Sequence, residues 1–359
     1  MSIELPIVNG KISTKALTYS NYSTPATFET IEIPATVAPT ELLVKVKAAS
    51  INPVDCILKN LSYTYLGSKK KVLGGDFSGV VIKAGESLEY KEGDEIYGDI
   101  LSPMKSVGSF SEYVLFDASK ATVLHKIPKG MSFSQAAALP IASATGFQSL
   151  NQYAGDLEGK NVLILGAGTS VGVNTIQFAK NHFKAANVVV TCSASSALKA
   201  KSLGADLIID YTKGESAKVA STLEFVKENG LFDVIVDCVR DNSFFDITDA
   251  VLKNQKDNGA FVRVSGSKVF DYKNPKFSEL LPSFRTLKYS FGAKFGCHAK
   301  FVEVFLHRDD NYGKVVEKLW NEKKFDIIID TEYDALTQHK EAFDKVASGK
   351  AKGKVVCTF

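Results

Sequence analysis

The sequence lacks several features that would place it in particular classes of protein. Its five cysteines are scattered, odd in number and free of C-x-x-C pairs, so we expect reduced thiols in a cytoplasmic setting and no disulfide framework. No apolar run approaches the ~20 residues that cross a bilayer, and the amino terminus lacks the basic start and apolar core of a secretory signal. The net charge is only +3 and the charges are interspersed, which argues against a nucleic-acid partner.

Residues that bind metals are also sparse. A zinc site needs three or four clustered thiolate, imidazole or carboxylate ligands. The histidines are spread along the chain, at His125, His182, His298, His307 and His339. The adjacent Cys297 and His298 do not make a site on their own, so no metal site is expected.

The remaining composition is that of a globular protein with two domains in 359 residues. Up to about Lys126 the chain reads as glycine-punctuated strands without a long helical repeat, which indicates a small β-barrel-like domain. From Ser134 an alanine-rich helical segment follows, in which Pro140 predicts a break.

Strands and helices then alternate, with helices expected at 172–183, 195–203, 215–229 and 243–253. Apolar strands in such alternation predict a parallel sheet covered on both faces. The last portion contains a helix, a short strand, a helix at 335–348 and a closing strand, and fits poorly as further repeats. We therefore expect an α/β fold with a β-rich domain at 1–140 and 302–359, a Rossmann domain at 141–301, and a cleft between them.

The stretch at 161–180, NVLILGAGTSVGVNTIQFAK, is the clearest functional signal. A buried strand is followed by Gly166, Gly168 and Gly172, which lead into a helix. Such a turn lets the backbone approach a pyrophosphate at the helix amino terminus. Glycines also serve βα turns for steric reasons alone, but the next strand, NVVVTCS, completes a βαβ unit and favours a dinucleotide site.

The end of that second strand bears on the identity of the cofactor. Sites that prefer NAD usually place an acid there to hold the ribose hydroxyls. This chain has Cys192 and Ser193 instead, with no acid to repel a 2′-phosphate, so we expect NADPH. Lys199 is the nearest basic residue.

Several short motifs in order carry a resemblance to a known family. They are AASINPVD (48–55), GGDFSGVVIKAG (74–85), GDEIYG (93–98), GSFSEYV (108–114), AAALPIASATGFQSL (136–150), LGADLIIDY (203–211), GAFVRVSG (259–266) and AKGKVV (351–356). Together they resemble the zinc-independent quinone oxidoreductase branch of the medium-chain dehydrogenase/reductases, nearly end to end, and look most like its fungal members. The resemblance implies a GroES-like catalytic domain and a Rossmann domain.

The resemblance also implies a chemistry. Zinc-dependent relatives carry a cysteine near the position of Asn52 and a His-Glu pair where this chain has Gly75 and Asp76. An NADPH-dependent, metal-free reductase of quinones or α,β-unsaturated carbonyls is therefore expected. The alternatives are an enoyl-thioester reductase, or a low-turnover NADPH sensor or lipid-surface protein.

The resemblance assigns roles to individual residues. It places Asn52 beside the nicotinamide ribose and Tyr63 against the substrate oxygen, although Tyr63 could equally be only a pocket wall. Further cofactor contacts are implied at Thr145, Val171, Tyr211, Val239, Ser265, Gly266 and Lys354. Thr169, Ser170 and Arg240 depart from the family pattern. The two hydroxyls can face phosphates or restrict the turn, and Arg240 can cap or obstruct the cofactor.

The segment 276–301 interleaves aromatic and basic residues. It is interpreted as a substrate-side loop with an edge strand of the sheet, or alternatively as a contact with a membrane or lipid droplet. An exposed strand edge near Leu287 to Ala293 would pair with a second copy, so a homodimer is expected.

Overall fold

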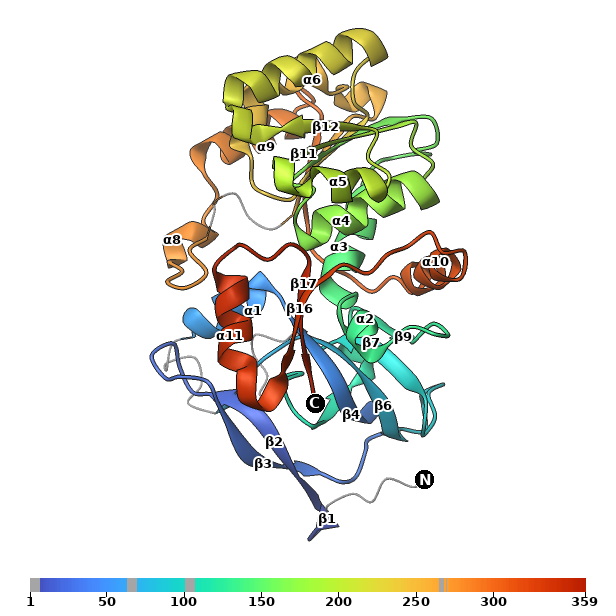
Figure 1. The fold of residues 1–359 in the computed structure, drawn as a ribbon, viewed down its shortest axis with the longest axis vertical. Coiled ribbons are helices and arrows are strands. Elements are labelled where there is room, and N and C mark those ends of the chain that lie inside the picture. Colours follow the sequence, from blue (N-terminus) through green and yellow to red (C-terminus); the bar gives the residue numbers. More distant parts are fainter. Residues whose placement is uncertain (1–6, 63–69, 101–106, 265–267, 269) are drawn as a thin grey trace.

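The computed structural model describes the chain except residues 1–6, 63–69, 101–106, 265–267 and 269. The described residues form three β-sheets, with a six-stranded sheet in one half and sheets of seven and four strands in the other (Figure 1). Helix α3 (Pro140–Leu150) leads from the second half into the first. Pro140 is its first residue, so the break predicted there separates α3 from α2 (Phe133–Ala137).

The six-stranded sheet is parallel throughout, in the order β12-β11-β10-β13-β14-β15. This is the doubly wound Rossmann order. Its strands are β10 (Asn161–Leu165), β11 (Asn187–Cys192), β12 (Leu207–Asp210), β13 (Val234–Asp237), β14 (Ala260–Val264) and β15 (Lys300–Val304). The expected domain boundary at residue 301 falls inside β15, and the sheet continues to Val304.

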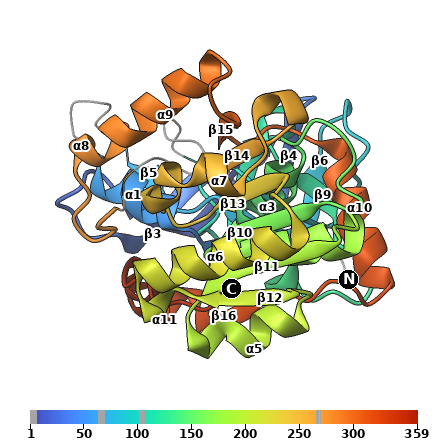
Figure 2. The ribbon, with the colours of Figure 1, turned by 90° about the horizontal axis from the view of Figure 1, so that it is seen from above.

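Helices cover both faces of this sheet. Successive side chains of a strand point to opposite faces, so alternate residues pack against different helices. In β10, Val162 and Ile164 pack with α3, α4 (Ser170–Gln177) and α5 (Ala194–Ser202). Leu163 and Leu165 pack instead with α6 (Glu215–Asn229), α7 (Thr248–Val251) and α9 (Phe284–Lys294). Figure 2 shows α5 and α6 on the two sides of β11 and β12. The predicted doubly covered parallel sheet is confirmed.

The seven-stranded sheet has the order β16-β17-β4-β6-β7-β9, with β8 also paired to β4. The strands are β4 (Glu41–Ile51), β6 (Asp76–Ala84), β7 (Glu95–Asp99), β8 (Tyr113–Asp117), β9 (Leu124–Lys126), β16 (Ile329–Asp334) and β17 (Lys354–Thr358). The smaller sheet holds β1 (Ile7–Val8), β2 (Lys11–Tyr19), β3 (Thr27–Pro34) and β5 (Lys71–Val72).

The end of the chain thus returns to the β-rich half. After α10 (Asp310–Asn321), β16 pairs with β17, and α11 (Ala335–Ala347) connects the two. Strand β17 lies antiparallel to β4, with Val355 opposite Ile51. Helix α1 (Pro53–Asn60) follows β4 and contacts α11.

Two predicted elements were wrong. The aromatic stretch 287–293 is not an edge strand but part of α9, because Thr286, Tyr289 and Ala293 are buried at helical spacing and Ser283 caps the first turn. The segment 243–253 is a 3₁₀ turn, η5 (Asn242–Asp246), followed by the short α7. The helix expected at 172–183 is α4 continued by a π-turn, η3 (Phe178–His182).

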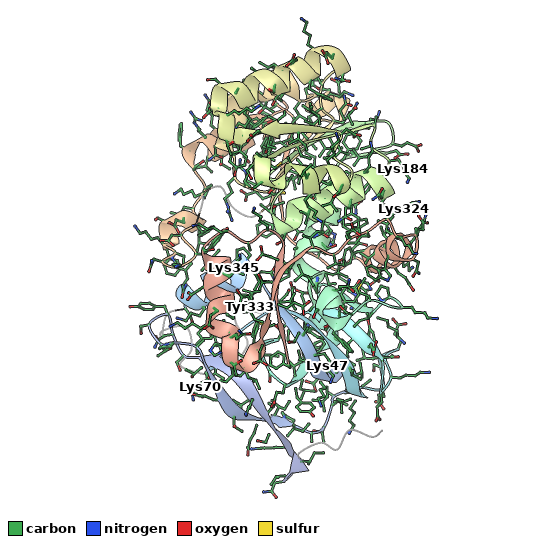
Figure 3. All side chains as sticks on the ribbon, viewed as in Figure 1. Lys47, Lys70, Lys184, Lys324, Tyr333 and Lys345 are labelled. Carbon is green, nitrogen blue, oxygen red and sulfur yellow. The ribbon has the colours of Figure 1, made fainter. Side chains whose placement is uncertain are left out.

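The surface carries its lysines over both halves. Figure 3 shows Lys70 beside the four-stranded sheet, whereas Lys184 and Lys324 lie near α10, far from that sheet. In the part of the chain that the structure describes, no helix combines the length and apolar character needed to cross a membrane.

Candidate active site

The turn after β10 is built so that two of its glycines cannot be replaced. Gly166 has φ +90°, and a Cβ there would lie 2.3 Å from Cγ1 of Val239. A Cβ on Gly172 would lie 2.3 Å from the carbonyl oxygen of Gly166. The backbone of β10, the start of α4 and the loop after β13 therefore meet at van der Waals distance, which is the close approach that the glycine pattern predicts.

The two hydroxyl residues that depart from the family pattern have structural partners. Thr169 caps α4, since its Oγ1 accepts from the Gly172 amide at 3.0 Å and donates to the Gly166 carbonyl at 2.9 Å. Ser170 Oγ donates to the carbonyl of Gly353 at 2.9 Å. The turn thus keeps its shape, and Ser170 ties it to the loop that precedes β17.

A pocket of about 830 Å³ opens beside this turn. It brings together seven of the predicted site residues, namely Gly166, Gly168, Thr169, Cys192, Ser193, Tyr211 and Val239. Its other wall is the loop at 349–352, which comes from the far end of the chain. The sequence reasoning missed that wall and also Thr191, Ser196, Glu215, Lys218 and Asp241.

The charges in the pocket suit an anionic ligand. No carboxylate directly follows β11, where Ser193 Oγ lies 3.0 Å from Ser195 Oγ. Lys350 and Lys352 line the opposite wall, and neither has an ion-pair partner among the described residues. Lys218 is paired with Asp241 and also donates to Ser243 Oγ at 3.0 Å. Lys350 and Lys352 therefore outnumber Glu215, the one other acid that lines the pocket without an ion-pair partner among the described residues. Lys199, the basic residue suggested by sequence, does not line the pocket.

Cys192 lies in the pocket wall as a neutral thiol. Burial raises its pKa above the ordinary value, and the carboxylate of Asp210 raises it further. A thiolate is the reactive form of cysteine. The residue therefore shapes the pocket and supplies no nucleophile at neutral pH.

Arg240 is held away from the glycine turn by its loop. Asp237 Oδ1 accepts the amides of Val239 and Asp241 at 3.0 and 3.1 Å, and Arg240 between them adopts φ +61°. The guanidinium lies 5.2 Å from the Phe270 ring centroid and is not part of the pocket wall. Of the two interpretations of Arg240, obstruction of this pocket is therefore not supported.

A buried ion pair fixes this loop. Arg263 and Asp237 are both fully buried, and Arg263 Nε donates to Asp237 Oδ2 at 3.1 Å. The guanidinium also lies over the ring of Phe245, 4.6 Å from its centroid. Asp237 thus holds Val239 against Gly166, a positioning role that the sequence pattern did not reveal.

Asn52 and Lys354 meet in a second cluster at the junction of the two halves. Lys354 Nζ donates to Asn52 Oδ1 at 2.7 Å, to Asp76 Oδ2 at 3.0 Å and to the Ile51 carbonyl at 3.3 Å. Asn52 Nδ2 donates to the same Asp76 oxygen at 2.8 Å. Asp76 Oδ1 in turn accepts the amide of Ile141 at the amino terminus of α3. The cluster joins β4, β6, β17 and α3, and the three hydrogen bonds from Lys354 Nζ account for all three of its ammonium hydrogens.

This cluster does not fit a zinc ion. The ammonium of Lys354 bonds to both side chains, Asn52 and Asp76, at the positions where zinc-dependent relatives carry ligands. An ammonium there repels a divalent cation, and an amide is a poor zinc ligand. Elsewhere in the described ranges, no three histidine, cysteine or acidic side chains form a group that could hold a metal.

The other predicted residues are placed separately. Thr145 is buried in α3, and its hydroxyl donates to the Ile141 carbonyl at 2.6 Å. Val171 lies in the first turn of α4. Tyr63, Ser265 and Gly266 lie outside the described residues.

The fold and the pocket define a class of protein, a two-domain oxidoreductase that binds a nicotinamide cofactor. Two protein-family models that match the chain agree with this class. Residues 38–129 match an alcohol dehydrogenase GroES-like domain, and residues 203–357 match a zinc-binding dehydrogenase domain.

The chain is also similar to individual proteins over almost its full length. It is 31% identical to protein YIM1-2 of Lachancea thermotolerans, over 96% of this chain and 98% of that protein. Among solved structures it resembles the quinone oxidoreductase of Coxiella burnetii, with a TM-score of 0.75 and 24% identity over 97% of this chain and 99% of that one. It also resembles the CurK enoyl reductase, with a TM-score of 0.73 and 18% identity over 96% of this chain and 99% of that one.

This chain belongs to the family of the fungal YIM1 proteins, and it combines an alcohol dehydrogenase GroES-like domain with a zinc-binding dehydrogenase domain. The predicted combination of a GroES-like domain and a Rossmann domain is confirmed.

Proposed function

We propose that this protein is an NADPH-dependent reductase that transfers hydride to quinones or α,β-unsaturated carbonyls without a metal ion. The observation that carries the proposal is the charge of the pocket beside the glycine turn. Ser193 stands where an acid would select NAD, and Lys350 and Lys352 face it without ion-pair partners among the described residues. This arrangement favours a dinucleotide with an additional phosphate.

Different residues of this pocket would hold different parts of the cofactor. The backbone at Gly166 and Gly168 would approach the pyrophosphate, while Ser193, Lys350 and Lys352 would contact the 2′-phosphate end. Val239, fixed by Asp237, would support the nicotinamide half. When bound, the nicotinamide supplies the hydride, and the protein supplies orientation and electrostatics.

The chemistry on the substrate side falls to the region around Asn52. On the family resemblance, Tyr63 would donate a hydrogen bond as negative charge develops on the substrate oxygen. The buried cluster of Asn52, Asp76 and Lys354 would fix the position of Asn52 beside the ribose. Because the Lys354 ammonium is fully bonded within the cluster, it serves to position Asn52 and not to protonate substrate.

The test is a screen of NADPH oxidation with quinones, simple enones and enoyl thioesters as acceptors. We expect turnover with quinones or enones, a lower affinity for NADH, and no loss of activity with a chelator. Turnover confined to enoyl thioesters would identify an enoyl-thioester reductase. Stoichiometric zinc that is lost together with activity would contradict the metal-free proposal.

A second candidate is a low-turnover NADPH-binding sensor. The observation that favours it is the same cluster, because the amide oxygen of Asn52 is already bonded to Lys354 and Asn52 Nδ2 to Asp76. Tight NADPH binding by calorimetry, with no oxidation by any acceptor, would select this alternative.

For association with partners we propose a homodimer formed through β15, the outermost strand of the six-stranded sheet. Its outer edge has no strand partner within the described residues and can extend the sheet into a second copy. The alternative is that this face contacts a lipid surface. It is supported by exposed aromatic side chains of α9, such as Phe284 and Phe291, which alternate with Arg285 and Lys288.

A further inference from the structure

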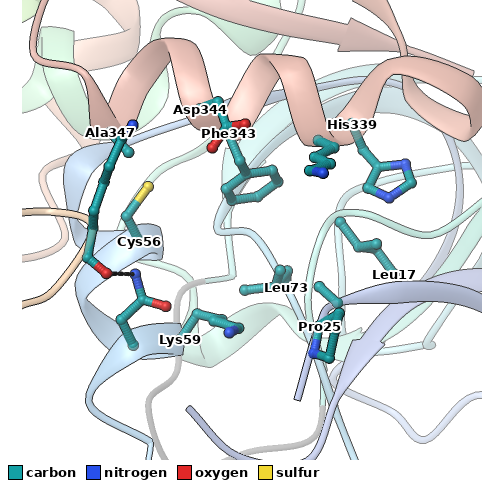
Figure 4. Close-up of a pocket in the computed structure, with 13 residues that line it drawn as sticks. Leu17, Pro25, Cys56, Lys59, Leu73, His339, Phe343, Asp344 and Ala347 are labelled. Atoms are coloured by element: carbon teal, nitrogen blue, oxygen red, sulfur yellow. Dashed lines mark hydrogen bonds between the residues drawn. The ribbon is translucent and has the colours of Figure 1, made fainter. Parts of the chain in front are cut away.

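A second pocket, of about 360 Å³, lies in the β-rich half between α1, α11 and the four-stranded sheet (Figure 4). Its walls are mainly apolar, with Leu17 and Leu73 from the sheet and Phe343 and Ala347 from α11. Leu17 and Leu73 are buried. A pocket of this size is at the small end of the ~300–1,000 Å³ range that encloses small molecules.

The rim of this pocket is cationic. Lys59, Lys273 and Lys340 line it, against the single acid Asp344. Within the described residues, neither Lys273 nor Lys340 has an ion-pair partner, and Lys59 Nζ donates only to the carbonyl of Tyr22, at 2.8 Å. Partial burial lowers the pKa of Lys59, so its ammonium is incompletely solvated. A negatively charged group at the rim would compensate these cations.

The ring of His339 forms another part of the pocket wall. Nδ1 of His339 is buried and has no hydrogen-bond partner among the described residues. Figure 4 shows His339 and Phe343 on the same helix, facing Leu17 and Leu73 across the pocket. The covered Nδ1 atom is not accessible from the pocket, so His339 contributes the rest of its ring to the wall.

We propose that this pocket binds a single-tailed organic anion of the medium-chain carboxylate class. The tail would lie among Leu17, Leu73 and Phe343, and the carboxylate would lie at the rim beside Lys273 and Lys340. An apolar wall with a separate cationic rim matches such a molecule, whereas a neutral apolar ligand would leave the rim uncompensated and an inorganic anion would leave the walls unfilled.

The pocket is distinct from the cofactor pocket but adjoins it through α11. Ala347 lines the anion pocket, and Gly349 to Lys352 line the cofactor pocket just beyond the end of the same helix. The rim is held in part by Asn60, whose Nδ2 donates to the carbonyls of Tyr272 and Lys273 at 2.9 and 3.1 Å. Lys273 therefore stays beside α1. The proposal does not depend on the reductase activity.

The direct test is calorimetric titration of the full-length protein with hexanoate, octanoate and decanoate below their micellar concentrations. A buried methylene contributes ~0.8 kcal/mol, or about fourfold in affinity, so affinity should rise steeply with length and level off once the pocket is full. Decyltrimethylammonium, which has the same tail and the opposite charge, should bind at least tenfold more weakly than decanoate. Equal binding of the two would overturn the proposal.

Variants locate the site. Lys273→Glu with Lys340→Glu should weaken decanoate at least tenfold, and both side chains are exposed, so folding should persist. Ala26→Trp should fill the pocket and abolish binding. The control is Lys227→Glu with Lys201→Glu, the same total charge change on the exposed surface of the distant helices α6 and α5, which should leave binding unchanged (Figure 1).

Competition separates the two pockets. Saturating NADPH should not displace decanoate from the wild-type protein, because their walls share no residue. Displacement by NADPH, or undiminished binding to the double lysine variant, would show that decanoate binds elsewhere and would refute the assignment.

Discussion

Replacing Asp55 with asparagine should remove the decrease in the free energy of unfolding that this carboxyl group is expected to cause as pH rises. Asp55 is 2% exposed, and its Oδ2 accepts the amide of Asn52 at 2.7 Å, which caps α1. Its Oδ1 is buried without a partner in the described part of the chain. Burial raises its pKa from 3.8 to about 7, with a smaller contribution from the nearby Asp76, while the Asn52 amide and Lys354 oppose the shift.

The sign of the effect follows from proton binding. Between pH ~4 and ~7 the folded protein keeps the Asp55 proton, while the unfolded chain has lost it. The free energy of unfolding therefore falls as pH rises through this window. At about 1.4 kcal/mol per pH unit, the loss from this single carboxyl group approaches ~4 kcal/mol above pH 7.

Asparagine keeps an oxygen for the cap and cannot ionise. The new amide hydrogens add a pH-independent cost of ~1–3 kcal/mol if they stay unpaired, so the diagnostic quantity is the change in slope and not the offset. Denaturant unfolding followed by circular dichroism between pH 5 and pH 8.5 covers about two pH units of this window, so the free energy of unfolding of the variant should rise relative to that of the wild type by ~2.7 kcal/mol. An exposed control, Asp326→Asn, should run parallel to the wild type. Parallel curves for Asp55→Asn and wild type would refute the reasoning.

Further tests address the cofactor, the cluster, the chemistry and the assembly. Ser193→Asp should weaken NADPH by about tenfold in calorimetry while sparing NADH, because a carboxylate repels the 2′-phosphate; equal losses for both would contradict the placement. Lys354→Met leaves Asp76 buried and unpaired and should lower the free energy of unfolding by ~3–5 kcal/mol, with partial recovery when Asp76→Asn is added. Tyr63→Phe should reduce turnover with enones by ~10²–10⁴-fold and less with quinones, at unchanged NADPH affinity, whereas a wall residue would mainly raise KM. Sedimentation at micromolar concentration should show a dimer, and a monomer alone would argue against pairing through β15.

The parts of the site that the sequence predicted are those encoded locally. The glycine turn, the strand before it and the residues after β11 lie within about 30 residues, so spacing alone brings Gly166 and Ser193 together. The loop at 349–352 lies far along the chain, and its lysines look like an ordinary solvated stretch until β17 pairs with β4. The same distance hides the bond between Lys354 and Asn52.

The edge strand predicted at 287–293, which is part of α9, was wrong for a different reason. Aromatic and β-branched residues favour strands, and LKYSFGA contains enough aromatics to suggest one. The burial of Thr286, Tyr289 and Ala293 follows a helical period instead, and tertiary packing decided the outcome. The ion pair of Arg263 and Asp237 was equally unpredictable, because single charged residues inside apolar strands carry no signal of their partner.

The pairing of β17 with β4 has a consequence for how the protein is made. Ile51 leaves the ribosome roughly 300 residues before its partner Val355. At ~5–20 residues per second, synthesis of that interval takes roughly 15–60 s. During that time the edge of β4 that β17 will cover stays open, while the six-stranded sheet, complete at Val304, can already fold. An unpaired strand edge invites association with other chains. A nascent chain arrested before β17 should therefore hold chaperones on its β-rich half and lose them when the last five-residue strand emerges.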